Sequence, residues 1–152
     1  MLHKLKENRG IIMITFVPEF VNADAEKANL FDVVDHIIAV GDMIGYDHLG
    51  LGSDFDGMMA SVEGLDGVDR FPHLVAAMLA RDIKESDIEK VLGLNLIRVL
   101  GEVEEAAREV SKSIRPLEEE VAPIINDEKM ALLQKMYPDA EPPREKKGHQ
   151  HA

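Results

Sequence analysis

A segment near the amino terminus, residues 10–17, is apolar at almost every position and shows no alternation of apolar and polar side chains. A strand with one face in water alternates, whereas a strand covered on both faces forms a continuous apolar run. The segment reads Gly-Ile-Ile-Met-Ile-Thr-Phe-Val and is ended by Pro18. We therefore expect a buried strand of a parallel sheet, which restricts the fold to the α/β class.

A helix and a second strand are expected directly after this strand. Residues 25–43 carry apolar side chains at helical spacing, with Asn22 or Asp24 as candidate caps and Gly45 as a stop. The second strand is predicted at residues 48–53, where glycines indicate close backbone packing or the approach of another group. Strand, helix and strand of these lengths form one βαβ unit with parallel strands.

Three further helices are expected after the second strand. They are predicted at residues 71–80, 87–92 and 95–110. Ser86 and Glu89 have the spacing of a capping box for the middle helix. The apolar face of the last helix is expected to point inward; it consists of Leu96, Val99, Leu100 and Val103.

Two strands are too few to bury both faces of a parallel sheet, and the strand at residues 10–17 would expose an apolar edge, which soluble proteins avoid. The sequence therefore predicts that more strands lie upstream in a longer parent chain or come from another chain, either in a homo-oligomer or as a complementing fragment. We assign residues 1–112 to the partial α/β domain, residues 113–140 to an extended arm with a short helix, and residues 141–152 to a charged, disordered tail.

The excess of acidic residues limits the classes of molecule that the chain can bind. Acidic residues outnumber basic residues by 29 to 17, and the formal net charge of −12 argues against nucleic acid or an anionic membrane surface. The chain has no cysteine, so disulfides and thiolate metal sites are excluded. No segment is apolar over a length that could span a bilayer, and residues 1–9 are predicted to form a polar helix and not a signal peptide, so the compartment stays open.

Two carboxylates follow the second predicted strand in the turn Gly52-Ser53-Asp54-Phe55-Asp56-Gly57. Parallel α/β folds bind their ligands at the carboxyl ends of the strands, and Asp54 comes just past such an end. A carboxylate there can accept a proton, hold a substrate ammonium or bind a metal ion. The alternative is an Asx-type turn that only ends the strand, and the spacing alone leaves both interpretations open.

The histidines form no clear metal-binding pattern. His48 precedes the second strand and is interpreted as a capping or packing residue, and His36 is interpreted as a hydrogen-bonded core residue of the preceding helix. His149 and His151 could bind a metal ion weakly, but solvated disorder is the preferred interpretation. No Ser-His-Asp spacing or phosphate-binding loop stands out.

Three separated blocks of the sequence carry a family resemblance. They are N-x-G-I-I-M-x-x-F at residues 8–16, H-L-G-L-G-S-D-F-D-G at residues 48–57, and a third block with E-G-L at 63–65, F-P at 71–72 and S-x-I-x-x-V-L-G-x-N-L-x-R-V at 86–99. In order and spacing they resemble the membrane (renal) dipeptidase family of zinc-dependent peptidases, over residues 2–103.

The resemblance implies the carboxyl-terminal portion of a metal-dependent-hydrolase (β/α)8 TIM barrel, in an enzyme that uses two zinc ions to hydrolyse dipeptides. Asp54 matches a family aspartate that contacts the amino end of the substrate and passes a proton to the leaving amine, so it is predicted to be catalytic and substrate-binding. Asp56 matches a second family aspartate and is predicted, with Gly52 and Gly57, to fix the turn. The zinc ligands of the family have no match in this chain.

Three functional hypotheses follow. In the first, the chain is a carboxyl-terminal fragment of a zinc-dependent dipeptidase, inactive alone because it lacks the zinc ligands. In the second, it is an inactive truncated remnant or a split-barrel partner that acts through protein–protein interaction. In the third, the acidic helix at residues 95–110 serves as an interaction surface. An upstream reading frame that encodes a His-x-Asp pair would favour the first hypothesis over the other two, and the most useful experiment is to measure the zinc content and dipeptide hydrolysis of the purified chain.

Overall fold

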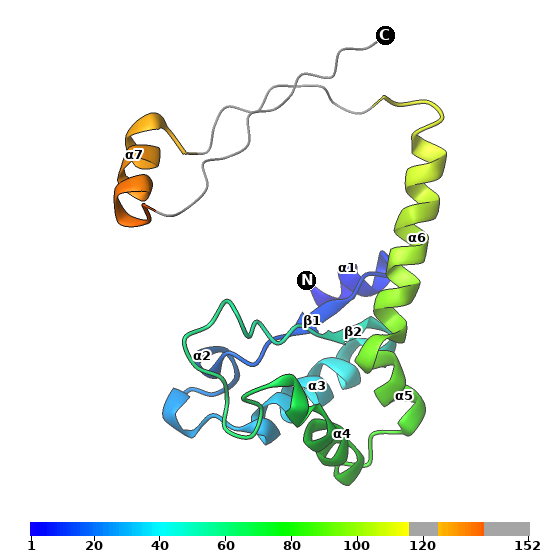
Figure 1. The fold of residues 1–152 in the computed structure, drawn as a ribbon. Helices are drawn as coiled ribbons and strands as arrows, with labels where there is room; N and C mark the ends of the chain where they lie inside the picture. Colours follow the sequence, from blue (N-terminus) through cyan, green and yellow to red (C-terminus); the bar gives the residue numbers. More distant parts are fainter. Residues whose placement is uncertain (116–124, 139–152) are drawn as a thin grey trace. The chain divides into compact units, whose positions relative to one another are not determined.

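The computed structural model describes residues 1–115 and 125–138, and the chain divides into two compact units, Met1–Ile114 and Arg115–Ala152. The first unit holds the sheet and most of the helices (Figure 1). The second holds helix α7, Asp127–Met136, whose N-cap Asn126 accepts a hydrogen bond from the Lys129 N–H at 2.9 Å. The predicted tail at residues 141–152, with His149 and His151, lies outside the described residues.

The predicted βαβ unit is confirmed. Strand β1, Ile12–Ile14, pairs in parallel with strand β2, Leu49–Leu51, and in the described residues these two strands form the whole sheet. Both strands are shorter than the predicted segments, but the ladder continues past them: the Phe16 N–H donates to the Ser53 carbonyl at 3.1 Å. The carboxyl ends of the two strands are thereby held side by side.

The glycines of β2 mark a close approach between the strands, as predicted. A β-carbon on Gly52 would lie 2.8 Å from the Met13 β-carbon, and one on Gly50 would lie 2.6 Å from the Met13 sulfur. Met13 therefore lies across both glycines on one face of the sheet. Its side chain is 37% exposed, so this face is open among the described residues, although the apolar run of β1 predicts cover on both faces.

The opposite face of the sheet carries the core. The fully buried side chains from β1, β2 and the helices α3 (Leu30–Ile44) and α4 (Phe71–Ala80) pack there in one cluster. Among the largest are Phe16, Ile37, Leu49, Leu74 and Met78. Figure 1 shows α3 and α4 lying on the same side of the two strands. The core thus fixes β2, and with it the turn that follows, against α3 and α4.

Helix α3 begins later than predicted. Its cap is Asn29 and not Asn22 or Asp24. The Asn29 N–H donates to the Asp32 carboxylate at 2.8 Å, and the Asn29 side-chain oxygen accepts from the Phe31 N–H at 2.9 Å, as in a capping box. The residues before it form the short helix α2, Pro18–Val21, and a 3-10 turn at Ala25–Lys27. The interpretation of His36 as a core residue is wrong, because this side chain lies on the exposed face of α3.

The helices after β2 agree with prediction in position, with one wrong cap. The elements of the first unit not yet given are α1 (Leu2–Glu7), 3-10 turns at Tyr46–His48 and Val68–Arg70, α5 (Glu85–Glu89), a π-helical turn (Lys90–Leu94) and α6 (Asn95–Val110). Ser86 lies inside the first turn of α5, whose N-cap is Lys84 without a side-chain hydrogen bond. No helix of the described chain is both long and apolar enough to cross a membrane.

The predicted inward face of α6 is wrong for three of its four residues, and the fourth, Val99, is half-buried. Leu96, Leu100 and Val103 are 40%, 53% and 58% exposed, and the one buried residue of the helix is the polar Asn95. Figure 1 shows α6 running well past the sheet, where the described residues of the first unit offer it nothing to pack against. Apolar periodicity predicts a face that avoids water, but it does not supply the surface that covers it.

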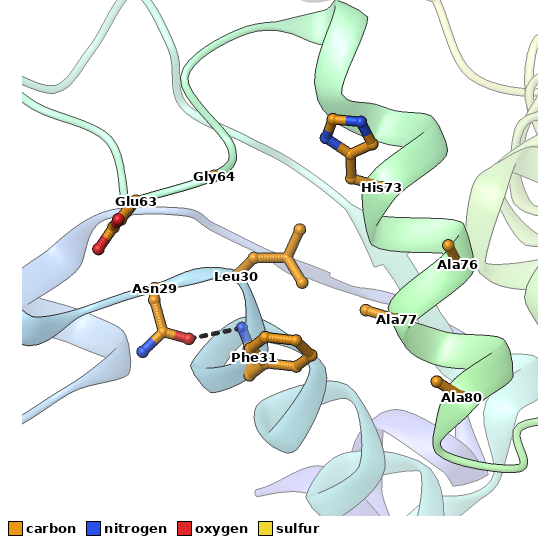
Figure 2. Close-up of a pocket in the computed structure, with 9 residues that line it drawn as sticks. All are labelled: Asn29, Leu30, Phe31, Glu63, Gly64, His73, Ala76, Ala77 and Ala80. Atoms are coloured by element: carbon orange, nitrogen blue, oxygen red, sulfur yellow. Dashed lines mark hydrogen bonds between the residues drawn. The ribbon is translucent and has the colours of Figure 1, made fainter.

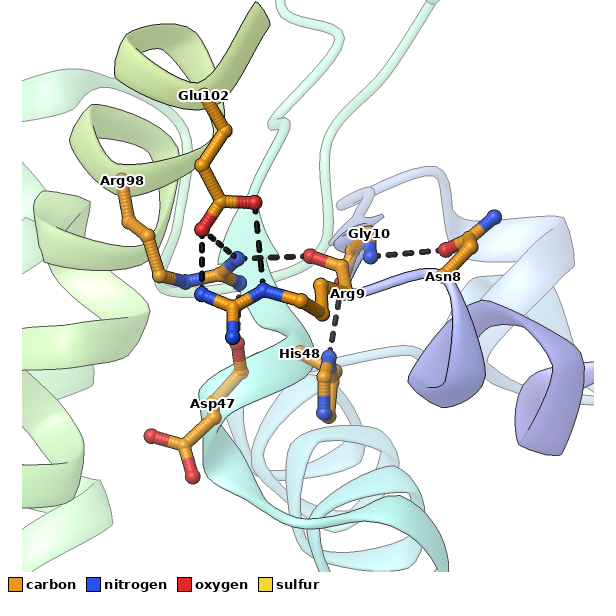
Figure 3. Close-up of polar contacts among 7 residues, drawn as sticks. All are labelled: Asn8, Arg9, Gly10, Asp47, His48, Arg98 and Glu102. Carbon is orange, nitrogen blue, oxygen red and sulfur yellow. Dashed lines mark hydrogen bonds and ion pairs between the residues drawn. The ribbon is translucent and has the colours of Figure 1, made fainter.

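A cluster of polar contacts holds the amino ends of both strands to α6 (Figure 3). Arg98 donates to the carbonyl of Arg9 at 2.8 Å and to the carbonyl of Asp47 at 3.0 Å, so it joins the residues that precede β1 and β2. The Arg9 guanidinium contacts Glu102 at 2.5 Å, and this hydrogen bond is the main reason that the pKa of Glu102 is lowered. We call these residues, with His48 and Gly10, the amino-end clasp.

Two buried side chains complete this end of the sheet. The His48 Nδ1–H donates to the Gly10 carbonyl at 2.9 Å, which confirms His48 as a packing residue. Asn95 is 4% exposed, and its amide nitrogen donates to the carbonyls of Tyr46 and Leu49 at 2.7 and 2.8 Å. Because both carbonyls flank the start of β2, Asn95 ties α6 directly to the strand that carries the turn.

Candidate functional site

The turn at residues 52–57 lies at the carboxyl end of β2, beside the residue that follows β1. Together they line a hollow of about 660 Å³. Its walls are Thr15, Leu51, Gly52, Ser53, Asp54, Phe55, Asp56 and Gly57. Because the two strands are parallel, both of their carboxyl ends open into this hollow, which is where α/β folds bind their ligands.

The backbone of the turn is unusual at Asp54. Its φ of 67° places a non-glycine residue in the left-handed region, which aspartate tolerates better than most residues. The Gly57 N–H donates to the Asp54 carbonyl at 2.9 Å and closes the turn. A β-carbon on Gly57 would overlap the Asp54 carboxylate oxygen Oδ1, so the side-chain position of Asp54 requires glycine at this point.

An aromatic contact anchors the turn to the core. The Phe55 ring packs edge-on against the fully buried Phe16, with ring centroids 5.7 Å apart, and lies 6.3 Å from the Phe71 ring of α4. Such edge-to-face pairs contribute about 0.5–1.5 kcal/mol beyond the area that they bury. Phe55 therefore fixes the segment between the two carboxylates, while Asp54 and Asp56 on either side point away from the core.

Both carboxylates of the turn are open to solvent. Asp54 and Asp56 are exposed, and neither side chain has a hydrogen bond or an ion pair with another described residue. Asp54 is thus free to accept a proton or to bind an ammonium group in the hollow. No hydrogen bond from the Asp56 side chain supports its predicted turn-fixing role in residues 1–115, whereas the contacts of Gly57 do involve Asp54. The roles assigned to both aspartates stay predictions.

The described residues do not fit a two-zinc centre. Across residues 1–115 and 125–138, no three His, Cys, Asp or Glu side chains come close enough together to hold a metal ion. His48, the one buried histidine of this part, is engaged with the Gly10 carbonyl at the far end of the strands.

Sequence reasoning missed three residues that shape the site. Thr15 directly follows β1 and lines the hollow, and the signal that could have identified it is a polar residue near the carboxyl end of the apolar run at residues 10–17. Asn95 and Arg98 lie at the start of α6 and hold the amino ends of the strands. Their signal is weaker, because a polar residue at the start of a helix is ordinarily interpreted as solvent-exposed.

Known proteins similar to this chain agree on one family. The family model for membrane dipeptidase, peptidase family M19, matches residues 1–114. Dipeptidase tcpJ of Claviceps purpurea is 50% identical over 141 residues, which is 93% of this chain and 33% of the relative. Dipeptidase aclJ of Aspergillus oryzae is 48% identical over 81% of this chain and 29% of its own length. The chain therefore spans about a third of the length of these relatives.

Solved structures give the same result. A metallopeptidase from Rhodobacter sphaeroides, liganded with a phosphinate mimic of the dipeptide L-Ala-D-Ala, is 31% identical with a TM-score of 0.61, over 66% of this chain and 29% of that one. A second metallopeptidase, described as dipeptidase AC of family M19, is 33% identical with a TM-score of 0.57, over 62% of this chain and 29% of that one. With the family model matching residues 1–114, this chain belongs to the membrane dipeptidase family, peptidase family M19.

Proposed function

We propose that this chain is the carboxyl-terminal portion of a metal-dependent dipeptidase of the (β/α)8 barrel type, to which it contributes two parallel strands and the Asp54 turn. The observation that carries the proposal is the position of Asp54. It follows the carboxyl end of β2, lines a hollow with Thr15 of the neighbouring strand, and has no partner among the described residues. The dipeptidase names of the similar proteins and the dipeptide mimic in the Rhodobacter structure support the substrate class.

The chemistry assigned to Asp54 is binding and proton transfer. A dipeptide carries an ammonium group at one end, and an exposed carboxylate in the hollow attracts it. Hydrolysis of the peptide bond releases an amine that must gain a proton, and the same carboxylate can carry that proton from the attacking water to the leaving nitrogen. A metal centre with the two zinc ions that the resemblance implies would supply the activated water, and its ligands would lie outside the described residues of this chain.

The test is a chimera. The upstream two-thirds of the Claviceps dipeptidase, joined to this chain at the matching position, supplies what this chain lacks relative to its relatives. We expect metal-dependent hydrolysis of Ala-Ala by the chimera. Asp54→Asn keeps the size of the side chain and should lower kcat by roughly two to four powers of ten at unchanged metal content, the usual loss for a general acid–base group.

Asp56→Asn is the matched control, because it makes the same change two residues away in the same turn. Its activity should stay within about tenfold of the parent, and its melting temperature should fall if Asp56 fixes the turn. A folded, metal-loaded Asp54→Asn chimera with near-parental turnover would refute the proposed role of Asp54. Reversed effects of the two substitutions would exchange the two assignments.

A specific observation favours a second function, that of a split-barrel partner or inactive remnant that acts through protein–protein contact. The open sheet face at Met13 and the exposed α6 side chains Leu100 and Val103 leave a large apolar surface uncovered among the described residues. We expect sedimentation velocity to show that the purified chain self-associates. Co-expression with the upstream segment of a relative should instead give a soluble complex of defined size.

Leu100→Lys tests the interaction function, and Glu105→Lys is its control, because it places a lysine at another exposed position of the same helix and changes the charge by even more. Leu100→Lys should abolish association with the upstream segment, whereas Glu105→Lys should leave it intact. A monodisperse monomer that ignores the upstream segment would rule out the interaction function.

A further inference from the structure

A second hollow lies away from the Asp54 turn, between the start of α3 and one face of α4 (Figure 2). Its volume is about 730 Å³, and none of its lining residues belongs to the hollow at residues 52–57. Ligand pockets for small molecules commonly have about 300–1,000 Å³. We call it the Phe31 groove, after the side chain that forms one wall.

The walls of the Phe31 groove are mostly apolar, and its polar lining side chains are Asn29 and Glu63 on one side and His73 of α4 across the groove from them. On α4, Ala76, Ala77 and Ala80 present only methyl groups, which leave room that larger side chains would fill. On α3, Leu30 forms the base and the Phe31 ring stands at the side, 54% exposed. Figure 2 shows these two residues facing the alanines across the hollow. An apolar body placed there would remove the Phe31 ring from water, which is favourable by about 25 cal/mol for each Å² covered.

The groove is built in advance by backbone hydrogen bonds. The Leu30 N–H donates to the Glu63 carbonyl at 2.9 Å, and the Glu63 N–H donates to the Ala28 carbonyl at 3.0 Å, so the loop and the start of α3 are held together. The capping box at Asn29 fixes the first turn of α3. The Asn29 side-chain oxygen accepts a hydrogen bond from the Phe31 N–H at 2.9 Å. Because this backbone donor at the start of α3 already has a partner, the helix end is poorly suited to an anion.

The polar rim of the groove favours a cation. Glu63 lines the groove on the side of Asn29, where Figure 2 shows its carboxylate, and it forms neither a hydrogen bond nor an ion pair with any described side chain. The exposed face of the Phe31 ring also attracts a cation. The Glu63 carboxylate and the Phe31 ring therefore both favour a positively charged ligand group at this end of the groove.

We propose that the Phe31 groove binds a small amphipathic amine in its ammonium form. The apolar body lies against Leu30 and the three alanines of α4, and the ammonium group lies at the rim between Glu63 and Phe31. This site shares no residue with the Asp54 hollow, so the proposed amine binding and the proposed peptidase function can be tested independently.

The test uses the full chain and three probes of one shape: 2-phenylethylamine, 2-phenylethanol and phenylacetate. Binding is followed by amide chemical shifts in two-dimensional NMR. We expect shifts at Phe31, Glu63 and α4, with the amine bound about two- to fivefold more tightly than the alcohol, the range for one exposed charge pair, and phenylacetate bound weakest. Glu63→Gln should reduce the amine to the affinity of the alcohol, and Glu85→Gln, on α5, should change nothing.

Ala76→Leu fills the groove from an exposed position of α4 and should weaken the amine and the alcohol at least tenfold, while the unchanged amide spectrum elsewhere reports an intact fold. Three results would overturn the proposal. They are shifts that gather at residues 52–57 instead of the groove, equal binding of all three probes, and an Ala76→Leu variant that binds the amine like the parent. The absence of shifts at millimolar amine would overturn it as well.

Discussion

Asn95→Ala should be among the most damaging single substitutions in the first unit. The Asn95 side chain is 4% exposed and donates two hydrogen bonds, to the carbonyls of Tyr46 and Leu49. Alanine removes both donors and leaves two carbonyls at the start of β2 without their side-chain partner. A buried polar group that loses its partner costs about 1–3 kcal/mol. Because a water molecule can enter the space left by the amide, we expect about 2–4 kcal/mol of lost unfolding free energy in total.

Ile97→Ala is the matched control, because it creates the same residue two positions further along α6, where the side chain is 66% exposed. It should change the unfolding free energy by less than about 0.5 kcal/mol, as is usual for surface positions. Urea denaturation followed by far-ultraviolet circular dichroism suits a chain without tryptophan. An Asn95→Ala midpoint equal to that of Ile97→Ala would show that the two carbonyls find other donors and would refute the assigned role.

Two further predictions concern the turn and the clasp. In thermal melts, Gly57→Ala should change the unfolding free energy by less than about 1 kcal/mol while it displaces the Asp54 carboxylate, because the atoms that its β-carbon would overlap are the free end of an exposed side chain, whereas Gly101→Ala, in open space on α6, should raise stability by about 0.5–1 kcal/mol. The pKa of Glu102 is lowered by its hydrogen bond from Arg9, so its contribution to stability is present above the ordinary carboxyl pKa and is lost as the pH falls through the lowered value. Thermal melts of the parent and of Glu102→Gln between about pH 3 and pH 7 should show that the parent loses more stability than the variant as the pH falls. Equal pH profiles of the parent and the variant would contradict this prediction.

The sequence predicted the elements that local rules control. The continuous apolar run and the glycines of the second strand identified both strands and their parallel pairing, and α4 and α6 have the predicted bounds. The start of α3 was missed because three candidate caps lie within eight residues, and only Asn29 has an acidic partner, Asp32, that completes a capping box. Cap chemistry depends on reciprocal geometry, which single residue types do not reveal.

The candidate site, like the fold, was predicted from the sequence only where a local rule applies. Asp54 follows directly from the rule that parallel strands present their carboxyl ends to ligands. The left-handed backbone of Asp54 and the contact of its carboxylate with Gly57 depend on how the turn closes, and no residue pattern announces them. Asn95 escaped notice because its partners, Tyr46 and Leu49, lie more than forty residues away along the chain.

The two ends of the parallel pair differ in a way that fits the proposed function. At the amino ends, the clasp residues and Asn95 satisfy the carbonyls of Arg9, Gly10, Asp47 and Leu49. At the carboxyl ends, Asp54 lines a hollow with its side chain unpaired among the described residues. Buried polar groups that stabilise a fold are ordinarily paired, whereas an exposed carboxylate is hydrated by water and loses no hydrogen-bonding energy while it has no protein partner. The substrate ammonium in the proposed function would therefore displace only water from Asp54, and no protein contact would have to break.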